Sequence, residues 1–297
     1  MIKELLKENL IFFEENKNLS AYTSWKIGGP ASLIVHPQNK KELKIVIKVL
    51  SDYKQPFFVL GNGSNVLVRD EGCSEVIIKL GEGFSRIEIR ENEITAGASV
   101  PLAALAAKAA EHSLGGLAYT SGIPGTVGGA LIMNAGAYGE EMKGIVSETE
   151  VFDVRNQEFY TLSNKELSFS YRSSFLKNNS GYIVVSVTVR LHTDDSAAIL
   201  QKMKKYKNER LMKQPYEFPN AGSVFKNPEG DSAGRLIESV GLKGRSVGGA
   251  QISEKHANFI VNKGGAKAKD VLTLISLIEK NIYDHYNIRL EKEIIIL

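Results

Sequence analysis

The chain has 297 residues, of which 43% are hydrophobic and 24% charged, and its net charge is +3. These values are ordinary for a globular protein and give no indication of disorder. The weak positive charge suits an enzyme with anionic substrates but does not indicate a nucleic-acid partner. The single cysteine, Cys73, excludes an internal disulfide and a multi-cysteine zinc site, and it favours a reducing compartment.

The first residues, 1–16, alternate apolar and charged side chains and predict an amphipathic helix instead of a signal peptide. Because no run of about 18 apolar residues follows, we expect no membrane insertion and a cytoplasmic protein. Short apolar runs separated by turn residues then predict the rest of a first unit. Its elements are a strand at Leu33–His36, a helix at Lys40–Tyr53, and strands at Phe57–Leu60, Val66–Val68 and Val76–Leu80.

The same signals, apolar periodicity and helix-breaking residues, predict two further units. The second has predicted strands at Ile87–Ile89, Glu93–Ala96, Glu148–Val154 and Tyr182–Leu191, and a helix at Leu102–His112. The third has predicted helices at Ser196–Lys213, Ser232–Val240 and Lys267–His285, and strands at His256–Asn262 and Ile294–Leu297. The fold class is therefore α+β in three units, with boundaries at 1–80, 81–192 and 193–297.

A first glycine loop, Gly61-Asn62-Gly63-Ser64-Asn65, joins two predicted strands. Glycines allow positive φ and a close approach of another molecule, and successive N–H groups in such a turn suit a phosphate. The loop is not a P-loop, because no Gly-Lys-Ser/Thr follows it. A tight hairpin with ordinary Asn-Gly turn chemistry is an equal alternative.

A second glycine segment runs Ser121-Gly122-Ile123-Pro124-Gly125-Thr126-Val127-Gly128-Gly129-Ala130. Fixing its glycines in one conformation costs conformational entropy. Their spacing does not match the dinucleotide fingerprint G-x-G-x-x-G. We interpret it as backbone that lies against a large ligand, with N–H groups directed at phosphate oxygens.

Two polar turns carry candidate catalytic side chains. Arg172, within Ser170-Tyr171-Arg172-Ser173-Ser174, offers a fork of donors for a carboxylate or an oxyanion, although a surface ion pair is the common alternative. Ser223, beside Gly222, is a poor acid but is able to protonate a strongly basic carbanion. Satisfying the N–H groups of its own turn is the alternative for that hydroxyl.

The remaining polar candidates have weaker local signals. Glu293, with Glu291, precedes the last strand, where glutamates are usually solvated. His256 ends a predicted strand, and the five histidines lack metal-ligand spacing, so we predict no metal. Arg210 and Lys213 lie on a basic, largely solvated helix face and are the residues nearest the Ser223 turn that offer phosphate contacts.

In their order, these segments resemble the UDP-N-acetylenolpyruvoylglucosamine reductase family of peptidoglycan precursor synthesis. The resemblance covers nearly the whole chain, and its motifs are specific together although each is weak alone. They are Thr23-Ser24-Trp25-Lys26-Ile27-Gly28-Gly29-Pro30-Ala31, Gly61–Asn65, Ser121–Gly129, Tyr171-Arg172, Ala221–Pro228, Gly248–Ser253, His256–Phe259 and Leu290–Glu293.

The resemblance implies a vanillyl-alcohol-oxidase (PCMH) type FAD-binding fold plus a C-terminal α+β substrate domain. It implies non-covalent FAD as cofactor, NADPH as reductant and the enolpyruvyl ether of a UDP-sugar as substrate. The glycine loops Gly61–Asn65 and Ser121–Gly129 are then the cofactor-binding segments. Arg172, Ser223 and Glu293 match the catalytic positions, with Ser223 as the proton donor. The expected substrate contacts are Tyr171, Arg210, Lys213, Asn227 and His256.

Two competing functions stay open at this point. Another oxidoreductase of the same flavin fold is one, although no histidine or cysteine is placed to tether FAD covalently. The other is a non-catalytic UDP-sugar-binding protein that uses the glycine loops only for phosphates. The path from Arg190 to Ser223 has room for little beyond one helix, so we expect the shorter family branch without a tyrosine lid. No obligate protein partner is evident.

Overall fold

The computed structural model describes all residues, 1–297, and divides them into two compact units. Unit 1 comprises Met1–Glu14, Leu33–Gly61 and Glu75–Glu209, and unit 2 comprises Glu15–Ser32, Asn62–Ser74 and Arg210–Leu297. The chain therefore passes between the units several times. The three predicted subdomain boundaries remain a proposal about how the chain is organised.

The N-terminus of unit 1 corrects one prediction. Helix α1 spans only Ile2–Glu8, and the chain then enters strand β1, Phe13–Asn18, so the predicted helix over 1–16 is too long. Asn9 closes the helix, and Leu10 adopts a left-handed φ of 58° that breaks helical hydrogen bonding. Phe12 then accepts a hydrogen bond from the His36 amide through its carbonyl (2.9 Å), which favours strand over helix here.

The first sheet has the strand order β1-β2-β5-β3. Its parallel pairs join β5 to β2 and to β3, and helix α2 packs its buried Leu43, Val46, Ile47 and Leu50 into the same apolar cluster as these strands. Asn39 caps α2 by accepting a hydrogen bond from the Glu42 amide (3.0 Å). The bounds are β2 Pro30–Val35, α2 Lys40–Asp52, β3 Phe57–Val59 and β5 Val76–Ile78.

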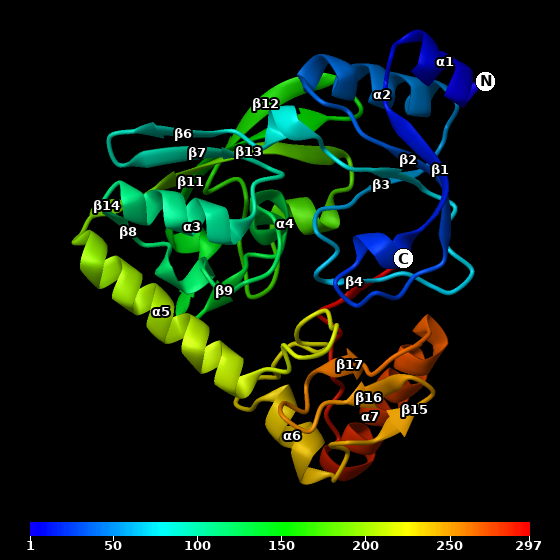
Figure 1. Cartoon of the computed structure of the whole chain (residues 1–297), viewed down its shortest axis with the longest axis vertical. Coiled ribbons are helices and arrows are strands. Elements are labelled where there is room, and N and C mark those ends of the chain that lie inside the picture. Colours follow the sequence, from blue (N-terminus) through cyan, green and yellow to red (C-terminus); the bar gives the residue numbers. More distant parts are fainter. The chain divides into compact units, whose positions relative to one another are not determined.

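The second sheet of unit 1 is antiparallel, with the order β12-β11-β13-β7-β6, and is visible beside α3 and α4 in Figure 1. Strand β12 is an edge strand that was not predicted, because four of its six residues are exposed and its apolar Phe159 and Leu162 do not form a continuous run. The bounds are β6 Ile87–Arg90, β7 Glu93–Gly97, α3 Leu102–Glu111, α4 Val127–Ile132, β11 Val146–Asp153, β12 Glu158–Ser163 and β13 Tyr182–Arg190.

Several short elements remain, of which residues 19–22 and the last turn of the helix after β14, from Arg210 on, belong to unit 2 and the others to unit 1. Pair β8–β14 and pair β9–β10 are two-residue antiparallel ladders, and helix α5 follows β14. Their bounds are β8 Leu114–Gly115, β9 Gly136–Ala137, β10 Glu140–Glu141, β14 His192–Thr193 and α5 Ser196–Lys213. Five 3₁₀ helices span Leu19–Tyr22 (η1), Glu82–Phe84 (η2), Ala118–Thr120 (η3), Met142–Gly144 (η4) and Phe175–Asn178 (η5).

Unit 2 is built around one apolar cluster to which helices α6 and α7 contribute. Trp25 lies fully buried in it and donates from Nε1 to the carbonyl of Ile260 (2.8 Å), so the Thr23–Ala31 motif serves the core of this unit. The bounds are β4 Val66–Leu67, α6 Ala233–Ser239, β15 Ser246–Val247, β16 Ala250–Ile252, β17 Ile260–Asn262, α7 Ala268–Tyr286 and β18 Ile295–Ile296.

The predicted strand at His256–Asn262 is correct only in its last part, β17. Residues 256–259 form a turn instead, in which the Ser253 hydroxyl accepts hydrogen bonds from the amides of Lys255 (3.1 Å) and His256 (3.3 Å). A serine oxygen that satisfies two successive amides stabilises a turn over a strand.

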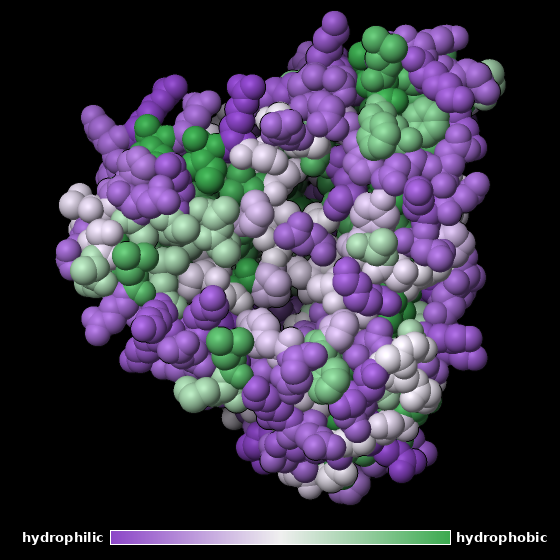
Figure 2. Space-filling model, viewed as in Figure 1, coloured by the Kyte–Doolittle hydropathy of each residue, from purple (hydrophilic) through white to green (hydrophobic).

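On the face drawn in Figure 2, most residues are hydrophilic, and hydrophobic residues form small separate groups. The large apolar side chains are concentrated in three buried clusters, two in unit 1 and one in unit 2. None of the helices is both long and apolar enough to span a bilayer.

Candidate active site

The first glycine loop is not a hairpin. Strand β3, before the loop, belongs to the first sheet, whereas β4, after it, pairs in parallel with β18. A Cβ added at Gly61 would lie 2.8 Å from the Thr126 hydroxyl, and one at Gly63 would lie 2.3 Å from the carbonyl oxygen of Tyr22. Close packing against Thr126 and Tyr22 therefore favours glycine at both positions.

Within unit 1, the contact between Gly61 and Thr126 brings the first residue of the first glycine loop next to the second segment, whereas residues 62–65 of that loop belong to unit 2. Thr126 is buried and caps α4 by accepting a hydrogen bond from the Gly129 amide (3.3 Å). Gly125 has a φ of 134°, which L side chains rarely adopt. Gly128 packs on Ala98, where a Cβ would meet the Ala98 Cβ at 2.9 Å.

Gly129 differs from these glycines. It is exposed, and a Cβ there would meet only the Thr126 hydroxyl, at an ordinary distance of 3.5 Å. Internal packing thus does not explain a glycine at this position, whereas backbone lying against a ligand does. That this segment lies against a ligand stays a prediction.

Lys79 is a candidate site residue that the sequence analysis did not identify. It follows strand β5, and its ammonium group donates to the carbonyl oxygen of Gly61 (2.7 Å) at the start of the first glycine loop. Burial lowers the pKa of Lys79. A single lysine at the end of the apolar run Val76–Ile78 is the signal that was available in the sequence.

Arg172 lies in unit 1 at a very tight turn. Ser170 and Ser173 exchange two backbone hydrogen bonds (3.0 and 3.1 Å), and Arg172 between them has a left-handed φ of 54°. Its guanidinium donates to the carbonyl of Gly136 (3.1 Å) and lies 5.2 Å from the ring centre of Tyr171, which is half exposed. Eleven other non-glycine residues of the chain also have a positive φ, so this conformation does not by itself mark a functional site.

Ser223 lies in unit 2, also at a turn. Gly222 takes the left-handed conformation (φ 75°), and its amide donates to the side-chain carbonyl of Asn220 (3.0 Å). The Asn220 side chain therefore forms the hydrogen bonds that stabilise this turn, and the half-buried Ser223 hydroxyl takes no part in them. The alternative of a serine that only stabilises its own turn does not describe this geometry.

Unit 2 also places Glu293 next to the Ser223 turn. The Glu293 amide donates to the carbonyl of Val224 (2.8 Å), and the Lys226 amide donates to the carbonyl of Glu291 (2.8 Å). Asn65, from the first glycine loop, holds the other side of this segment by donating to the Glu293 carbonyl (3.1 Å). Two predicted catalytic residues from distant parts of the sequence thus become neighbours, while Arg172 belongs to the other unit.

His256 lies at the turn that follows β16. Its Nδ1 accepts a hydrogen bond from the Asn258 amide (3.3 Å), and its ring meets the Phe259 ring edge-on at 4.8 Å. Burial is the main reason that the pKa of His256 is lowered, with Lys243 adding to it. A predicted ligand contact at this position would therefore use a neutral imidazole.

The last turn of α5 carries the two predicted phosphate contacts. Arg210 donates to the hydroxyl of Tyr216 (3.2 Å) and to Gln214 (3.4 Å), whereas Lys213 is exposed. Lys255 donates to the carbonyl of Leu211 (2.6 Å) and so ties this helix end to the His256 turn. All of these residues belong to unit 2.

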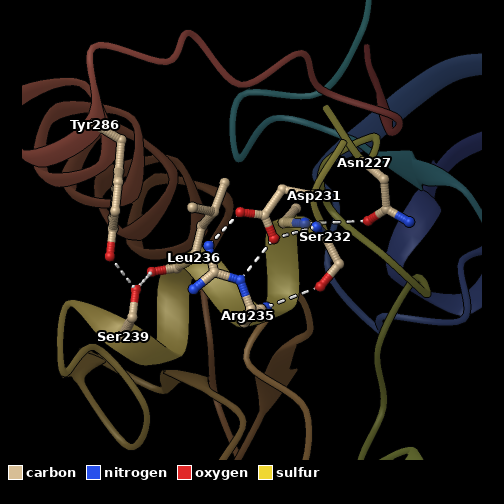
Figure 3. Close-up of polar contacts among 8 residues, drawn as sticks. Asn227, Asp231, Ser232, Arg235, Leu236, Ser239 and Tyr286 are labelled. Carbon is tan, nitrogen blue, oxygen red and sulfur yellow. Dashed lines mark hydrogen bonds and ion pairs between the residues drawn. The ribbon is translucent and has the colours of Figure 1, made fainter. Parts of the chain in front are cut away.

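Asn227 precedes α6 in the chain and contacts the first residue of that helix, in the polar network of Figure 3. Its side-chain carbonyl accepts a hydrogen bond from the Ala233 amide (3.1 Å), Ser232 caps the helix, and Asp231 pairs with Arg235. Hydrogen bonding to Arg235 lowers the pKa of Asp231 to about 2. The network fixes the position of Asn227 relative to the first turn of α6.

Comparisons with known proteins define first the class and then the family. An FAD binding domain matches residues 31–157, which places the chain among the FAD-dependent oxidoreductases. The C-terminal domain of UDP-N-acetylenolpyruvoylglucosamine reductase matches residues 214–297. With the full-length relatives described next, these matches show that the chain belongs to the UDP-N-acetylenolpyruvoylglucosamine reductase family.

The relatives align over almost their whole length. The reductase of Anoxybacillus flavithermus is 44% identical over 98% of this chain and 96% of its own, and that of Clostridioides difficile is 41% identical over 100% and 96%. The crystal structure of the Thermus caldophilus reductase superposes with a TM-score of 0.84 at 39% identity, over 96% of this chain and 99% of that one. The predicted family, the α+β fold with its FAD-binding and C-terminal domains, and FAD as cofactor are confirmed.

Proposed function

We propose that the chain reduces UDP-N-acetylglucosamine enolpyruvate to UDP-N-acetylmuramate with NADPH, using Arg172, Ser223 and Glu293 as its catalytic residues. Family membership supports the reaction. The backbone pairing that makes Ser223 and Glu293 neighbours is the observation that carries the assignment of residues. FAD, when bound, supplies the hydride chemistry between NADPH and the terminal carbon of the enol ether.

The three residues divide the chemistry between them in this proposal. Hydride addition to the terminal carbon leaves negative charge on the neighbouring carbon, from which it spreads into the substrate carboxylate. The fixed guanidinium of Arg172 stabilises this enolate, as preorganised charge does where water is excluded. The Ser223 hydroxyl gives its proton to the same carbon from one face, which yields a single lactyl stereoisomer. Glu293 orients the reacting groups or replaces the proton on Ser223.

The remaining predicted residues divide between cofactor and substrate. We assign the two glycine segments and Lys79 to FAD. We assign Tyr171, Arg210, Lys213, Asn227 and His256 to the UDP-sugar. Lys213 is exposed and suits a charge-assisted contact with a phosphate. We further propose a cytoplasmic location, because a single cysteine suits a reducing compartment and both substrates are nucleotides.

An absorbance experiment tests the function against its two alternatives. The purified protein should be yellow, and heat or acid should release its FAD unchanged. Under anaerobic conditions NADPH should bleach the flavin absorbance, and the UDP-enolpyruvyl sugar should restore it. A colourless protein that binds the UDP-sugar would indicate a binding module. A flavin that is reduced by an alcohol but not reoxidised by the UDP-enolpyruvyl sugar would indicate an oxidase.

A further inference from the structure

Asn258 has no assigned role, yet its buried side chain holds the segment that carries Ser223. Only 3% of Asn258 is exposed. Its Oδ1 accepts a hydrogen bond from the Phe225 amide (3.0 Å), and its Nδ2 donates to the Phe225 carbonyl (2.8 Å). Its backbone carbonyl accepts a third hydrogen bond, from the Val224 amide (2.9 Å).

This side chain takes the place of a neighbouring β-strand. In a ladder, one residue donates its N–H to the partner strand and accepts at its C=O. The side-chain amide of Asn258 offers the same donor and acceptor to Phe225. On the other edge, the partner is a backbone segment that contains Lys292 and Glu293. Phe225 forms an antiparallel β-bridge with Lys292, and the Glu293 amide donates to the carbonyl of Val224. The stretch 224–226 is thus held from both edges.

The turn that presents Asn258 is itself well fixed. The Ser253 hydroxyl and the His256 ring each accept backbone hydrogen bonds within the turn, and the flanking residues Ala257 and Phe259 are buried. Movement of the Asn258 amide therefore requires rearrangement of the turn. Ser223 directly precedes the clamped residues, so any change in their register moves its hydroxyl.

We propose that Asn258 is a positioning residue, which sets the place of the Ser223 hydroxyl relative to Glu293 for proton transfer. The inference rests on the proposed function of Ser223. An error of about 1 Å in a reacting group can cost about 10²-fold in rate. The alternative is that Asn258 contributes only to the stability of unit 2.

The substitution Asn258→Asp separates these two readings. A protonated carboxyl group donates and accepts as the amide does, so it preserves both hydrogen bonds to Phe225. An ionised carboxylate only accepts, and it repels the Phe225 carbonyl. Burial raises a carboxyl pKa above its ordinary value of about 3.9. The neutral form therefore predominates at low pH, and the defect appears as the pH rises through this raised pKa.

We expect Asn258→Asp to slow reoxidation of the reduced flavin by the UDP-enolpyruvyl sugar at least about tenfold near pH 8. Near pH 5 the rate should return toward that of the unsubstituted enzyme, and flavin reduction by NADPH should be unaffected throughout. Rates are taken as ratios to the unsubstituted enzyme at each pH. The titratable and charged groups beside this segment are His256, Glu293 and the Lys226–Glu291 pair (2.5 Å), and the ratio cancels the titrations that the substitution leaves unchanged.

Asn262→Asp is the matched control. Asn262 is also buried in unit 2, and its side chain bonds to the carbonyl of Trp25 and to the amides of Gly264 and Ala266, away from the Ser223 segment. It should lower thermal stability as Asn258→Asp does, without a selective loss of the reoxidation rate. Asn258→Ala provides a second test, because it removes both side-chain hydrogen bonds and should slow reoxidation at every pH.

The outcomes are distinct. Equal slowing by the Asn258 and Asn262 variants, equal slowing of both half-reactions, or no recovery of Asn258→Asp at low pH would each overturn the positioning role. If the unsubstituted enzyme itself fails to reoxidise with the UDP-enolpyruvyl sugar, the proposed function fails instead. In D₂O, a rise in the wrong lactyl stereoisomer for both Asn258 variants, and not for the control, would support the inference.

Discussion

The Arg172 turn and the Ser223 turn each present a polar side chain that we assign to the chemistry, but they distribute backbone strain differently. In unit 1, Arg172 itself adopts the left-handed conformation, inside a closed pair of hydrogen bonds between Ser170 and Ser173. In unit 2, Gly222 takes the left-handed position, and the functional residue follows it in the chain. The first turn combines strain and function in one residue, and the second separates them.

This difference has a measurable consequence. A left-handed L-residue costs about 1–2 kcal/mol, whereas glycine adopts the same backbone without that penalty. Substitution of the functional side chain should therefore leave the stability of the Ser223 turn unchanged. At the Arg172 turn, the effect on stability should depend on whether the new residue is glycine.

The largest expected effect is that of Ser223→Ala. Because it removes only the proposed proton donor, reoxidation of the reduced flavin by the UDP-enolpyruvyl sugar should slow by ~10²–10⁴-fold. Flavin reduction by NADPH and the thermal midpoint should stay near those of the unsubstituted enzyme. Anaerobic stopped-flow absorbance follows the two half-reactions separately.

Two results would contradict this assignment. Equal slowing of both half-reactions would mean that Ser223 shapes the site and does not donate the proton. No change in either would move the donor elsewhere, with Glu293 as the leading candidate. Ser246→Ala is a suitable control, since this serine lies in the same unit and bonds only locally, to the carbonyl of Gly244 and to Gln251.

The second prediction compares Arg172→Ala with Arg172→Gly. Both remove the guanidinium, and both should slow reoxidation by ~10²–10³-fold, the loss typical of one donor to a developing oxyanion. Arg172→Ala keeps the left-handed strain, whereas Arg172→Gly relieves it. In urea unfolding, the glycine variant should be more stable than the alanine variant by about 1 kcal/mol. If glycine is instead the less stable of the two, the turn is not strained at Arg172.

Much of the fold could be predicted from the sequence, because long helices and buried strands leave clear apolar periods. Helix α5 matches its predicted bounds, Ser196–Lys213. The errors occur where a local hydrogen bond overrides the apolar pattern. Leu10 ends the first helix with a left-handed φ, and the Ser253 hydroxyl converts the start of a predicted strand into a turn.

The residues of the candidate site could be named from the sequence, but the sequence did not show which of them lie next to each other in the fold. Motifs indicated Ser223 and Glu293 singly, yet only the tertiary pairing of Val224 with Glu293 makes them neighbours. Asn258 gave one signal, an amide within an otherwise apolar run, Ala257–Val261, where a buried polar group must find partners. That its partners are the two polar groups of Phe225 could not be predicted without the fold.

The smallest expected effect is that of Gly222→Ala. Nothing lies within 4 Å of a Cβ at this position, so the substitution causes no clash and tests the left-handed backbone alone. It should lower the free energy of unfolding by about 1 kcal/mol and slow reoxidation much less than Ser223→Ala does, because the hydroxyl remains. The control is Gly181→Ala, at an equally open position without a left-handed φ, where alanine should be neutral or stabilising. If both substitutions leave stability unchanged, Gly222 does not carry the strain of its turn. If Gly222→Ala slows reoxidation as strongly as loss of the hydroxyl, strain and function are coupled at the Ser223 turn as they are at Arg172.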